Sequence, residues 1–386
     1  MKPALYENNP VCFKVFNYMM KIAIDIRSTV KRKTGIGYYT LNLAEHLAAL
    51  DTANFYYLYS KIGLFNRKKT LLNISGANFK HRVNRLNLPP KLMLRGVDAL
   101  HTSSFDIIPP KRTKLILVVH DVIHKAYPKA HGENTAKSID ESLKIILDRA
   151  AIVIAVSMTT KNDLIKFYKV DTDMIKVIYP GINEDILSDN YEPDNNLRLL
   201  QDKHLINLPY ILYVGTIEPR KNVDNLVRAY GLMKDKYRIK HGLVIAGMKG
   251  WMYDKVFTLV KELNLTKNII FTDYVSRNDL RALYEHADMF IYPSFYEGVG
   301  LPVLEAFAFG LPVITSNVSS TAEVAGGAAL LIDPNKPEDI ASKANDILSD
   351  HKLKAALKEK ALKRAADFSW EKAARRTLEV ISESLN

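Results

Sequence analysis

Cysteine is almost absent from this sequence, because Cys12 is the only one among 386 residues. A single cysteine excludes a disulfide framework within the chain and a zinc site built from cysteines, so we expect a free thiol in a reducing cytoplasm. Long apolar runs are missing too: no stretch approaches the roughly 18 consecutive apolar residues that would span a bilayer. The composition, 47% hydrophobic and 25% charged, is nevertheless that of a folded globular protein.

The N-terminal segment 1–19 lacks the long apolar core and the small-residue cleavage site of a signal peptide. Met20 then opens the stretch MKIAIDIRS, which has the pattern of a first strand. We hypothesise that translation begins at Met20, or that 1–19 is a loose extension of the fold.

The positive charge is concentrated in the first half of the chain. Residues 1–190 hold 28 Lys and Arg against 17 Asp and Glu, a net +11 out of +12 for the whole sequence. Basic residues cluster at 31–33, 67–69, 80–95 and 111–114. A solvated face explains any one cluster, but together they indicate a half that meets something anionic, with nucleic acid and a membrane surface as candidates.

Short β-rich runs alternate with amphipathic helical segments along the chain. Many runs are continuously apolar, as expected of parallel strands that are covered on both faces. The alternation predicts doubly wound α/β sheets, and twelve strands are too many for one sheet, so we predict two Rossmann-like domains joined within the polar segment 181–208. The expected strands are 21–26, 55–60, 99–104, 114–121, 152–157 and 175–181 in the first domain, and 210–216, 242–247, 269–274, 289–294, 312–317 and 328–333 in the second.

Ligands of open α/β sheets lie beyond the carboxyl ends of the strands, so the residues that follow the strands are the candidates for a site. Gly35 and Gly37 stand in a basic loop before a helix, where the backbone can approach an anion, although a plain turn explains them equally well. His120 and Asp121 could move a proton or hold a substrate hydroxyl, although a core histidine bonded to the backbone is the simpler interpretation.

Further charged residues follow the strands of the second half. Arg220 and Lys221 precede an amphipathic helix and suit a diphosphate, although a surface pair of cations is an equal alternative. Glu297 lies in the loop before the helix LPVLEAFAFG, and Glu305 lies about one turn inside it. A carboxylate in this apolar stretch is costly unless it is partnered, and no Lys or Arg lies within the helix, so we expect sugar hydroxyls to be the donors.

The stretch EGVGLPVLEAFAFGLPVI is similar, almost residue by residue, to the E-x7-E motif of retaining glycosyltransferases of the GT-B fold. VGTIEPRKN, VVHDV, TGIGYYT and FSWEKAA also match that family, and the resemblance runs from about residue 20 to the end. Taken singly, only the E-x7-E stretch is specific. The chain resembles bacterial enzymes of family 4, many of which are mannosyltransferases of surface-polysaccharide assembly.

The resemblance implies two Rossmann-like domains that face each other across a cleft. The acceptor-binding domain would span 20–185 and the nucleotide-sugar-binding domain 186–369. A last helix, 370–386, would cross back and pack on the first domain.

It also implies how the donor would be held. Arg220 and Lys221 would bind its diphosphate and stabilise the leaving nucleotide. Glu305 would accept hydrogen bonds from the ribose, and Glu297 would contact the donor sugar. Further donor contacts, mostly through the backbone, are expected at Gly37, Tyr274, Val275, Gly298, Gly300, Leu301, Val303 and Leu304.

On the acceptor side the expected residues are Gly35, His120 and Asp121, and His120 would lie near the transferred sugar. The expected catalytic residues are therefore Glu297, His120, Arg220 and Lys221.

The implied reaction transfers a hexose with retention from a nucleotide sugar to a lipid-linked or oligosaccharide acceptor in O-antigen, lipopolysaccharide or exopolysaccharide synthesis. We expect GDP-mannose as the donor, with a UDP-sugar of the glucose, galactose or GlcNAc type as the alternative. No metal or other cofactor is expected, since the family needs none and the Asp-x-Asp at 171–173 lies in an expected loop. We expect a cytoplasmic enzyme, either free or held at the inner face of the membrane through its basic first domain.

Other classes of protein stay open. A sugar-nucleotide epimerase would share the architecture and would use no acceptor. A basic nucleic-acid-binding protein would explain the charge, but no zinc spacing, RNA-binding aromatic motif or reader helix is present, so we expect no nucleic acid as a partner. A catalytically silent partner subunit is opposed by the intact glutamates and cations of the motifs.

Overall fold

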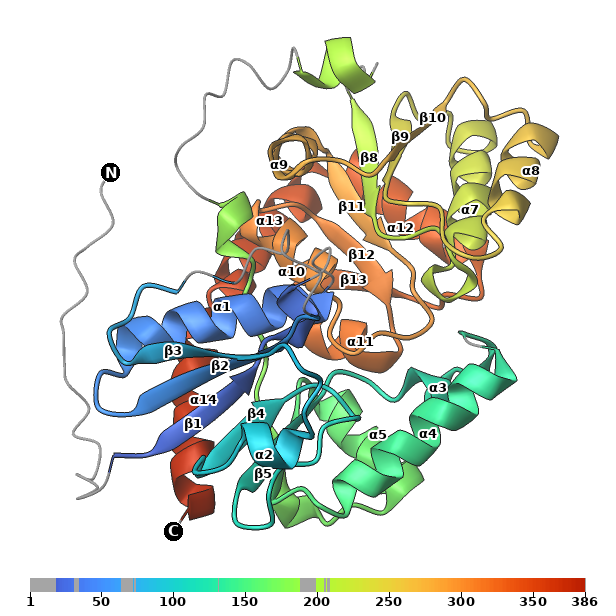
Figure 1. Cartoon of the computed structure of the whole chain (residues 1–386). Coiled ribbons are helices and arrows are strands. Elements are labelled where there is room, and N and C mark those ends of the chain that lie inside the picture. The colour runs from blue at the N-terminus through green and yellow to red at the C-terminus, as the bar shows by residue number, and fades with distance from the viewer. Residues whose placement is uncertain are drawn as a thin grey trace, which may run out of the picture.

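The computed structural model describes residues 19–30, 35–63, 72, 74–130, 132–187, 199–204, 206 and 209–385. They form two α/β domains, one below the other in Figure 1, each built on a sheet of parallel strands. The predicted N-terminal extension, except Met19, lies outside the described residues, as do Cys12 and the basic clusters 31–33 and 67–69.

The first sheet has seven parallel strands in the order β3-β2-β1-β4-β5-β6-β7. Helices α1 (Gly35–Leu50) and α14 (Trp370–Leu385) cover one face, and α4 (Glu133–Leu147) and α5 (Met158–Tyr168) cover the other. The strands are β1 (Lys21–Asp25), β2 (Phe55–Lys61), β3 (Phe79–Asn84), β4 (Ala99–Thr102), β5 (Lys114–Val119), β6 (Ile152–Ala155) and β7 (Ile175–Val177).

Alternate residues of β5 show why these strands read as continuous apolar runs. Ile116 and Val118 belong to the core under α1 and α14, whereas Leu117 and Val119 belong to the core under α4. Successive side chains of a strand point to opposite faces, and here both faces are covered, so neither set can be polar.

The second sheet has six parallel strands in the order β10-β9-β8-β11-β12-β13. Its strands are β8 (Tyr210–Val214), β9 (Gly242–Ala246), β10 (Ile269–Asp273), β11 (Met289–Tyr292), β12 (Val313–Ser316) and β13 (Ala329–Ile332). Helix α7 (Val223–Asp235) packs against α8 (Asp254–Glu262) and α12 (Pro337–Ser349). Helix α10 (Leu301–Ala308) packs against α11 (Ser319–Ala325) and α13 (His351–Ala365), and α9 (Arg277–His286) contacts β8.

The twelve predicted strands are all present, but the count of twelve is wrong because β3 was missed. Its sequence FKHRVN pairs with β2 at the edge of the first sheet, and its Lys80 and His81 are exposed. An edge strand with charged side chains resists pairing with other chains, and the same charges hide it from a search for apolar runs. The predicted residue limits of the two domains stay a prediction.

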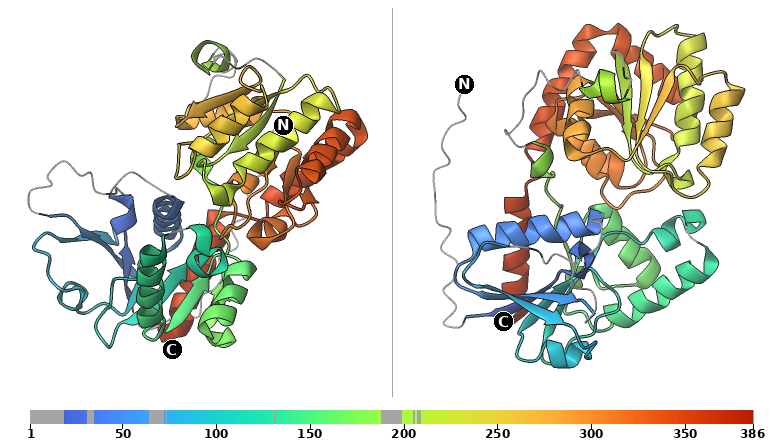
Figure 2. Two further views of the ribbon diagram at one scale, coloured as in Figure 1. Left: turned by 90° about the vertical axis from the view of Figure 1, so that its right-hand side faces the viewer. Right: turned by 45° about the horizontal axis from the view of Figure 1, so that its top comes forward.

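Helix α14 returns from the second domain to the first and packs along α1 (Figures 1 and 2). The chain segments that cross between the domains touch at Gly181, where an added Cβ would lie 2.2 Å from the backbone nitrogen of Trp370. Only glycine therefore allows this approach. Every helix within the described ranges is too short or too polar to span a bilayer.

A carboxylate of the second domain caps a helix of the first. Glu323 of α11 accepts hydrogen bonds from the backbone N–H of Met158 (2.6 Å) and of Thr159 (2.9 Å), at the N-terminus of α5. It also accepts bonds from the hydroxyls of Thr159 and Tyr179. The first N–H groups of a helix lack partners within the helix and carry a partial positive charge, so this contact fixes one domain against the other.

We expect the substitution Glu323→Ala to loosen this joint. The variant leaves two helix N–H groups without their acceptor, which should lower the free energy of unfolding by about 1 kcal/mol or more. Each kcal/mol lowers the melting temperature by roughly 2–4 °C. Thermal unfolding and the radius of gyration from small-angle scattering measure the effect, with the exposed Glu359→Ala on α13 as the matched control. Equal melting temperatures and radii for the two variants would contradict this role of Glu323.

Candidate functional site

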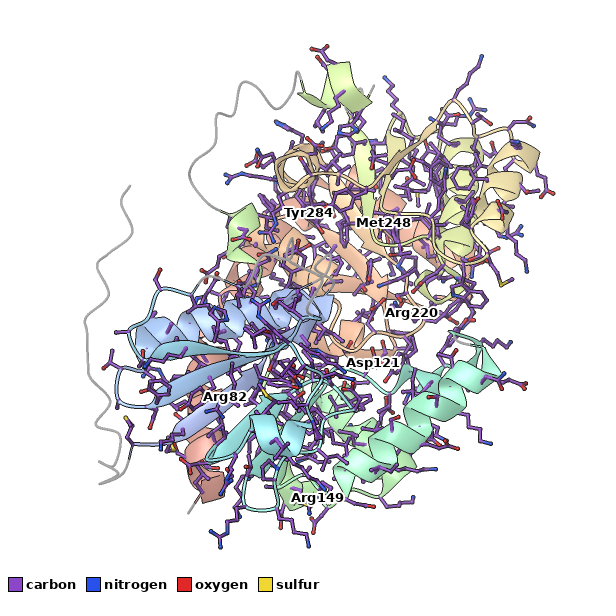
Figure 3. All side chains as sticks on the ribbon, viewed as in Figure 1. Arg82, Asp121, Arg149, Arg220, Met248 and Tyr284 are labelled. Atoms are coloured by element: carbon purple, nitrogen blue, oxygen red, sulfur yellow. The ribbon has the colours of Figure 1, made fainter. Side chains whose placement is uncertain are left out.

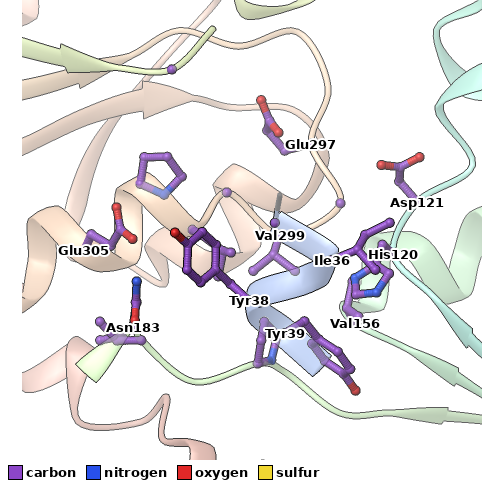
Figure 4. Close-up of a pocket in the computed structure, with 18 of the residues that line it drawn as sticks. Ile36, Tyr38, Tyr39, His120, Asp121, Val156, Asn183, Glu297, Val299 and Glu305 are labelled. Carbon is purple, nitrogen blue, oxygen red and sulfur yellow. The ribbon is translucent and has the colours of Figure 1, made fainter. Parts of the chain in front are cut away.

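A cavity of about 540 Å³ lies between the two domains, at the carboxyl edges of both sheets. Residues that follow β8 and β11 line it from the second domain, and these strands lie where the strand order reverses. Such a reversal is where open α/β sheets bind ligands. Figure 4 shows Glu305 at one end of the cavity and His120 and Asp121 at the other, with Glu297 between them.

Glu297 is buried in a cluster of charged and hydroxyl groups. Its Oε1 accepts a hydrogen bond from Lys221 Nζ at 2.7 Å, and its Oε2 lies 2.8 Å from Arg220 Nη1. The hydroxyls of Tyr292 (3.0 Å) and Ser294 (2.7 Å) also donate to Oε1. Burial alone would raise the pKa of Glu297, but the two cations and Ser294 lower it to about 2. The carboxylate is therefore ionised at any physiological pH.

Arg220 connects this cluster to a second carboxylate. Its Nη2 donates to Glu218 Oε1 at 2.7 Å, and its Nη1 donates to the carbonyl of Tyr296 at 2.9 Å. Lys221 is also buried, and burial lowers its pKa despite the attraction of Glu297. Arg220, Lys221, Glu218 and Glu297 together carry no net charge, so an added anion would make the site negative, and further hydrogen-bond donors would have to stabilise that charge.

The absence of Lys and Arg from the helix disfavoured a cation partner for either glutamate, and for Glu297 that inference is wrong. The two cations lie 76 and 77 positions earlier in the chain, and the adjacent strands β8 and β11 bring them to it. A search for Lys or Arg within the same helix could not find partners that the sheet supplies.

Glu305 has a different environment. Its Oε2 accepts a hydrogen bond from the Tyr284 hydroxyl at 3.0 Å, and it lines the cavity from the middle of α10. Burial raises the pKa of Glu305 to about 7, because Tyr284 and the more distant Arg277 offset only part of the cost of removing the charge from water. Glu305 therefore has room for further hydrogen-bond donors from the cavity side, whereas Glu297 is already surrounded.

His120 follows β5 and lines the same cavity. Its Nε2 lies 3.0 Å from Ser103 Oγ, and its ring meets that of Tyr39 edge-on with 4.8 Å between the centroids. Burial and the neighbouring His101 lower the pKa of His120 to about 4, so the imidazole is neutral at pH 7. A neutral ring can accept or donate a hydrogen bond, but it supplies no positive charge.

Gly298 brings the two domains into contact beside His120. A Cβ on this residue would lie 2.0 Å from the His120 carbonyl oxygen, a distance that no side chain could occupy. The loop after β11 therefore lies directly on the loop after β5. Across the cavity, the Arg277 guanidinium of α9 stacks 4.6 Å from the ring centroid of Tyr38 on α1.

Most of the predicted site residues line the cavity, and five of them do not. Those that line it are Gly35, His120, Asp121, Arg220, Lys221, Glu297, Gly298, Gly300, Leu301 and Glu305. Val303 and Leu304 point into the core of the second domain, Gly37 is buried within α1, and Tyr274 and Val275 follow β10 outside the cavity wall. The roles predicted for all of these residues stay predictions.

Sequence reasoning missed several wall residues. Tyr38 and Asn183 line the cavity near Glu305 (Figure 4), and Glu218 and Tyr292 lie beside the cations. Glu218 lies within the motif GTIEPRKN, just after the expected strand 210–216, so its position could have marked it as a candidate site residue. For Asn183, in the link between the domains, the sequence offers no comparable signal.

Two family profiles match the chain in succession. "Glycosyltransferase Family 4" matches residues 33–186, and "Glycosyl transferases group 1" matches residues 199–364. The O-antigen chain mannosyltransferase B of Escherichia coli is 33% identical over 271 residues, which cover 70% of this chain and 71% of that protein. The serotype-specific mannosyltransferase WbdA of the same species is 27% identical over 285 residues, but this chain spans only 35% of its length.

Solved structures share the whole fold. WaaG, a glycosyltransferase involved in lipopolysaccharide biosynthesis, superposes with a TM-score of 0.69 at 17% identity, over 93% of this chain and 99% of that one. HepE of Anabaena, solved in complex with UDP and glucose, gives a TM-score of 0.70 at 17% identity, over 94% of this chain and all of that one. The chain therefore has the GT-B architecture and belongs to the group 1, family 4 glycosyltransferases.

Proposed function

We propose that this chain is a retaining, metal-independent hexosyltransferase that transfers mannose from GDP-mannose to a lipid-linked or oligosaccharide acceptor in bacterial surface-polysaccharide synthesis. The observation that supports the proposal most is the single cavity that holds the buried Arg220, Lys221 and Glu297 cluster in its middle and Glu305 at one end. Its volume of about 540 Å³ lies within the usual range of ligand sites, roughly 300–1,000 Å³.

In this proposal the donor lies along the cavity with its ribose at Glu305 and its sugar at Glu297. The diphosphate lies between them, beside Arg220 and Lys221, where backbone N–H groups at the start of α10 supply further donors. These donors are needed because the existing charges of the cluster already cancel.

The proposed reaction breaks the bond between the anomeric carbon and the phosphate oxygen. The acceptor oxygen forms its bond to that carbon on the same face, and its proton passes to the departing phosphate oxygen. Negative charge grows on the leaving diphosphate, and Arg220, Lys221 and the helix N–H groups stabilise it. His120, neutral at pH 7, hydrogen-bonds the transferred sugar.

The choice of mannose is supported by the mannosyltransferase relatives. A UDP-sugar is the second candidate, because a protein of the same fold binds UDP and glucose.

We expect calorimetry without metal to show selective binding of GDP over UDP, ADP, CDP and TDP. Glu305→Ala should weaken GDP binding roughly 10- to 100-fold, since it removes a charged hydrogen-bond acceptor. Glu297→Ala should leave GDP affinity unchanged or tighter, because it frees two cations, while it slows transfer of labelled mannose by roughly 10²–10³. Selective UDP binding would favour the second candidate. Full transfer activity in both variants, or no nucleotide binding, would overturn the assignment.

The raised pKa of Glu305 predicts a pH dependence of nucleotide binding. Ribose hydroxyls stabilise the ionised form, so binding below pH 7 must release a proton, and affinity should rise about tenfold per pH unit towards pH 7 and then level off. Glu305→Gln should remove this dependence. The terminal phosphate of GDP titrates near pH 6 in both proteins, so the difference between their profiles isolates Glu305.

The ligand-free protein gives an independent check on the same group. Because the pKa of Glu305 is higher in the folded chain than in the unfolded one, folding is favoured at low pH, and this contribution is lost as the pH rises through about 7. Unfolding curves at pH 5 and pH 8 should therefore differ less for Glu305→Gln than for the unchanged protein. Parallel pH profiles of the two proteins, in binding and in stability, would contradict the assignment.

We also propose that the first domain attaches to anionic membranes through the segment 85–95. This segment, which includes α2 (Pro90–Met93), exposes apolar side chains among cations. Its exposed leucines are Leu86, Leu88 and Leu92, and its exposed cations are Arg85, Lys91 and Arg95. Each cation near a lipid surface contributes roughly 1 kcal/mol, and the leucines can enter the interface.

We expect the protein to float with vesicles that contain phosphatidylglycerol and to remain unbound with phosphatidylcholine alone. The double variant Leu86→Gln/Leu92→Gln should lose most of this binding. Leu263→Gln, which changes an exposed leucine of the second domain, is the matched control and should bind fully. Equal flotation on both kinds of vesicle, or no effect of the double variant, would rule out attachment through this segment.

A further inference from the structure

A second cavity, of about 190 Å³, lies beside the first at the boundary of the two domains. Tyr127, just after α3 (Ile123–Ala126), lines it from the first domain, while Phe295, Met252, Asp224 and Lys255 line it from the second. None of these residues has a role in the donor arrangement described above.

Glu218 connects the two cavities, because it lines both of them. Its carboxylate is held by Arg220 at 2.7 Å, and Arg220 in turn holds Glu297 at 2.8 Å. The second cavity therefore adjoins the Glu297 part of the first cavity, where the donor sugar is proposed to lie, and not the Glu305 end. A group bound in the second cavity would therefore lie next to the proposed position of the reacting sugar, on the side away from Glu305.

The walls of the second cavity combine aromatic and charged groups. The rings of Tyr127 and Phe295 stack across the domain boundary, with 5.9 Å between centroids and 12° between planes. Asp224 lies at the start of α7 and Lys255 in the first turn of α8. Asp224 interacts electrostatically with Tyr127 of the same wall. Within the part of the chain that the structure describes, no hydrogen bond or ion pair holds the side chain of Asp224 or Lys255, so both can still engage a ligand.

These walls suit a sugar ring. At about 190 Å³ the cavity is smaller than the roughly 300 Å³ at which sites for larger ligands begin, so it holds one ring and not a nucleotide. A pyranose offers an apolar C–H face to an aromatic side chain and hydroxyls that can both donate and accept, which matches a carboxylate and an ammonium in one wall. A purely apolar group would make no use of either charge, whereas sugar hydroxyls can bond to both.

We propose that this second cavity is an acceptor subsite, which binds the sugar unit of a saccharide acceptor next to the one that receives the transferred hexose. The inference rests on the proposed transferase function and assigns the acceptor's chemical class: an oligosaccharide of at least two units. The subsite makes the enzyme select a chain already begun over a single sugar.

The test blocks the cavity without removing its aromatic walls. Met252 is 41% exposed and lines the cavity, so Met252→Trp fills it. Met248, on the same loop after β9, is 42% exposed and lines neither cavity, so Met248→Trp is the matched control (Figure 3). A second variant, Tyr127→Ala, removes an aromatic face and guards against an effect of the tryptophan itself.

Saturation-transfer NMR measures direct binding of methyl α-mannoside, α-mannobiose and α-mannotriose in the presence of GDP. The unchanged protein and Met248→Trp should bind the longer saccharides at least tenfold more tightly than the monosaccharide. Met252→Trp and Tyr127→Ala should lose that preference. In transfer assays the same two variants should show a raised KM for mannotriose and an unchanged kcat.

GDP affinity, measured by calorimetry, separates the two proposals. Unchanged GDP binding with a lost preference for longer saccharides supports the subsite. The absence of saccharide binding in the unchanged protein, or an equal preference in Met252→Trp and Met248→Trp, overturns the subsite even where GDP binds normally. Failure of every nucleotide to bind overturns the donor site instead, and saccharide binding still reports on the second cavity.

Discussion

The site is organised by the cost of burying the carboxylate of Glu297. That charge is tolerated because two cations and two hydroxyls surround it at 2.7–3.0 Å. The cations come from the loop after β8 and the hydroxyls from the end of β11, which are adjacent strands. The ion-pair cluster therefore fixes these two loops against each other at the point where the strand order reverses, and the walls of the main cavity follow from this constraint.

The two glutamates of the E-x7-E motif differ because the fold places different groups around them. Glu297 is held ionised by its cations, and its pKa is about 2. Among the described residues, Glu305 accepts a hydrogen bond from the Tyr284 hydroxyl and feels the more distant Arg277, and its pKa is about 7. In the proposed donor site, Glu297 is a permanent part of a preorganised polar wall. In the same proposal Glu305 becomes more fully ionised when ribose hydroxyls donate to it, so binding at this end of the cavity depends on pH.

Much of this architecture could be predicted from the sequence, because parallel strands covered on both faces must be apolar at every position. Strand β3 was not predicted because it lies at the edge of the sheet, where Lys80 and His81 are exposed to water and interrupt the apolar pattern. Most of the motif residues line the cavity, because it lies at the carboxyl edges of the sheets, where the residues that follow the strands meet. Contacts between residues far apart in the chain could not be found in this way, including Glu323 with the N-terminus of α5 and Tyr127 with Phe295. No local pattern encodes them, since each depends on how two separate domains meet.

The boundary between the domains also explains why donor and acceptor should act together. Gly298 touches the backbone of His120, and Glu218 belongs to both cavities while it is bound to Arg220. In our proposal a diphosphate competes with Glu218 for the positive charge and the donors of Arg220, and so weakens the hold of that guanidinium on Glu218. In our proposal this leaves the Glu218 carboxylate freer to accept a hydroxyl from a sugar in the second cavity. By the reciprocity of linked binding, a saccharide that engages Glu218 would in turn favour the nucleotide.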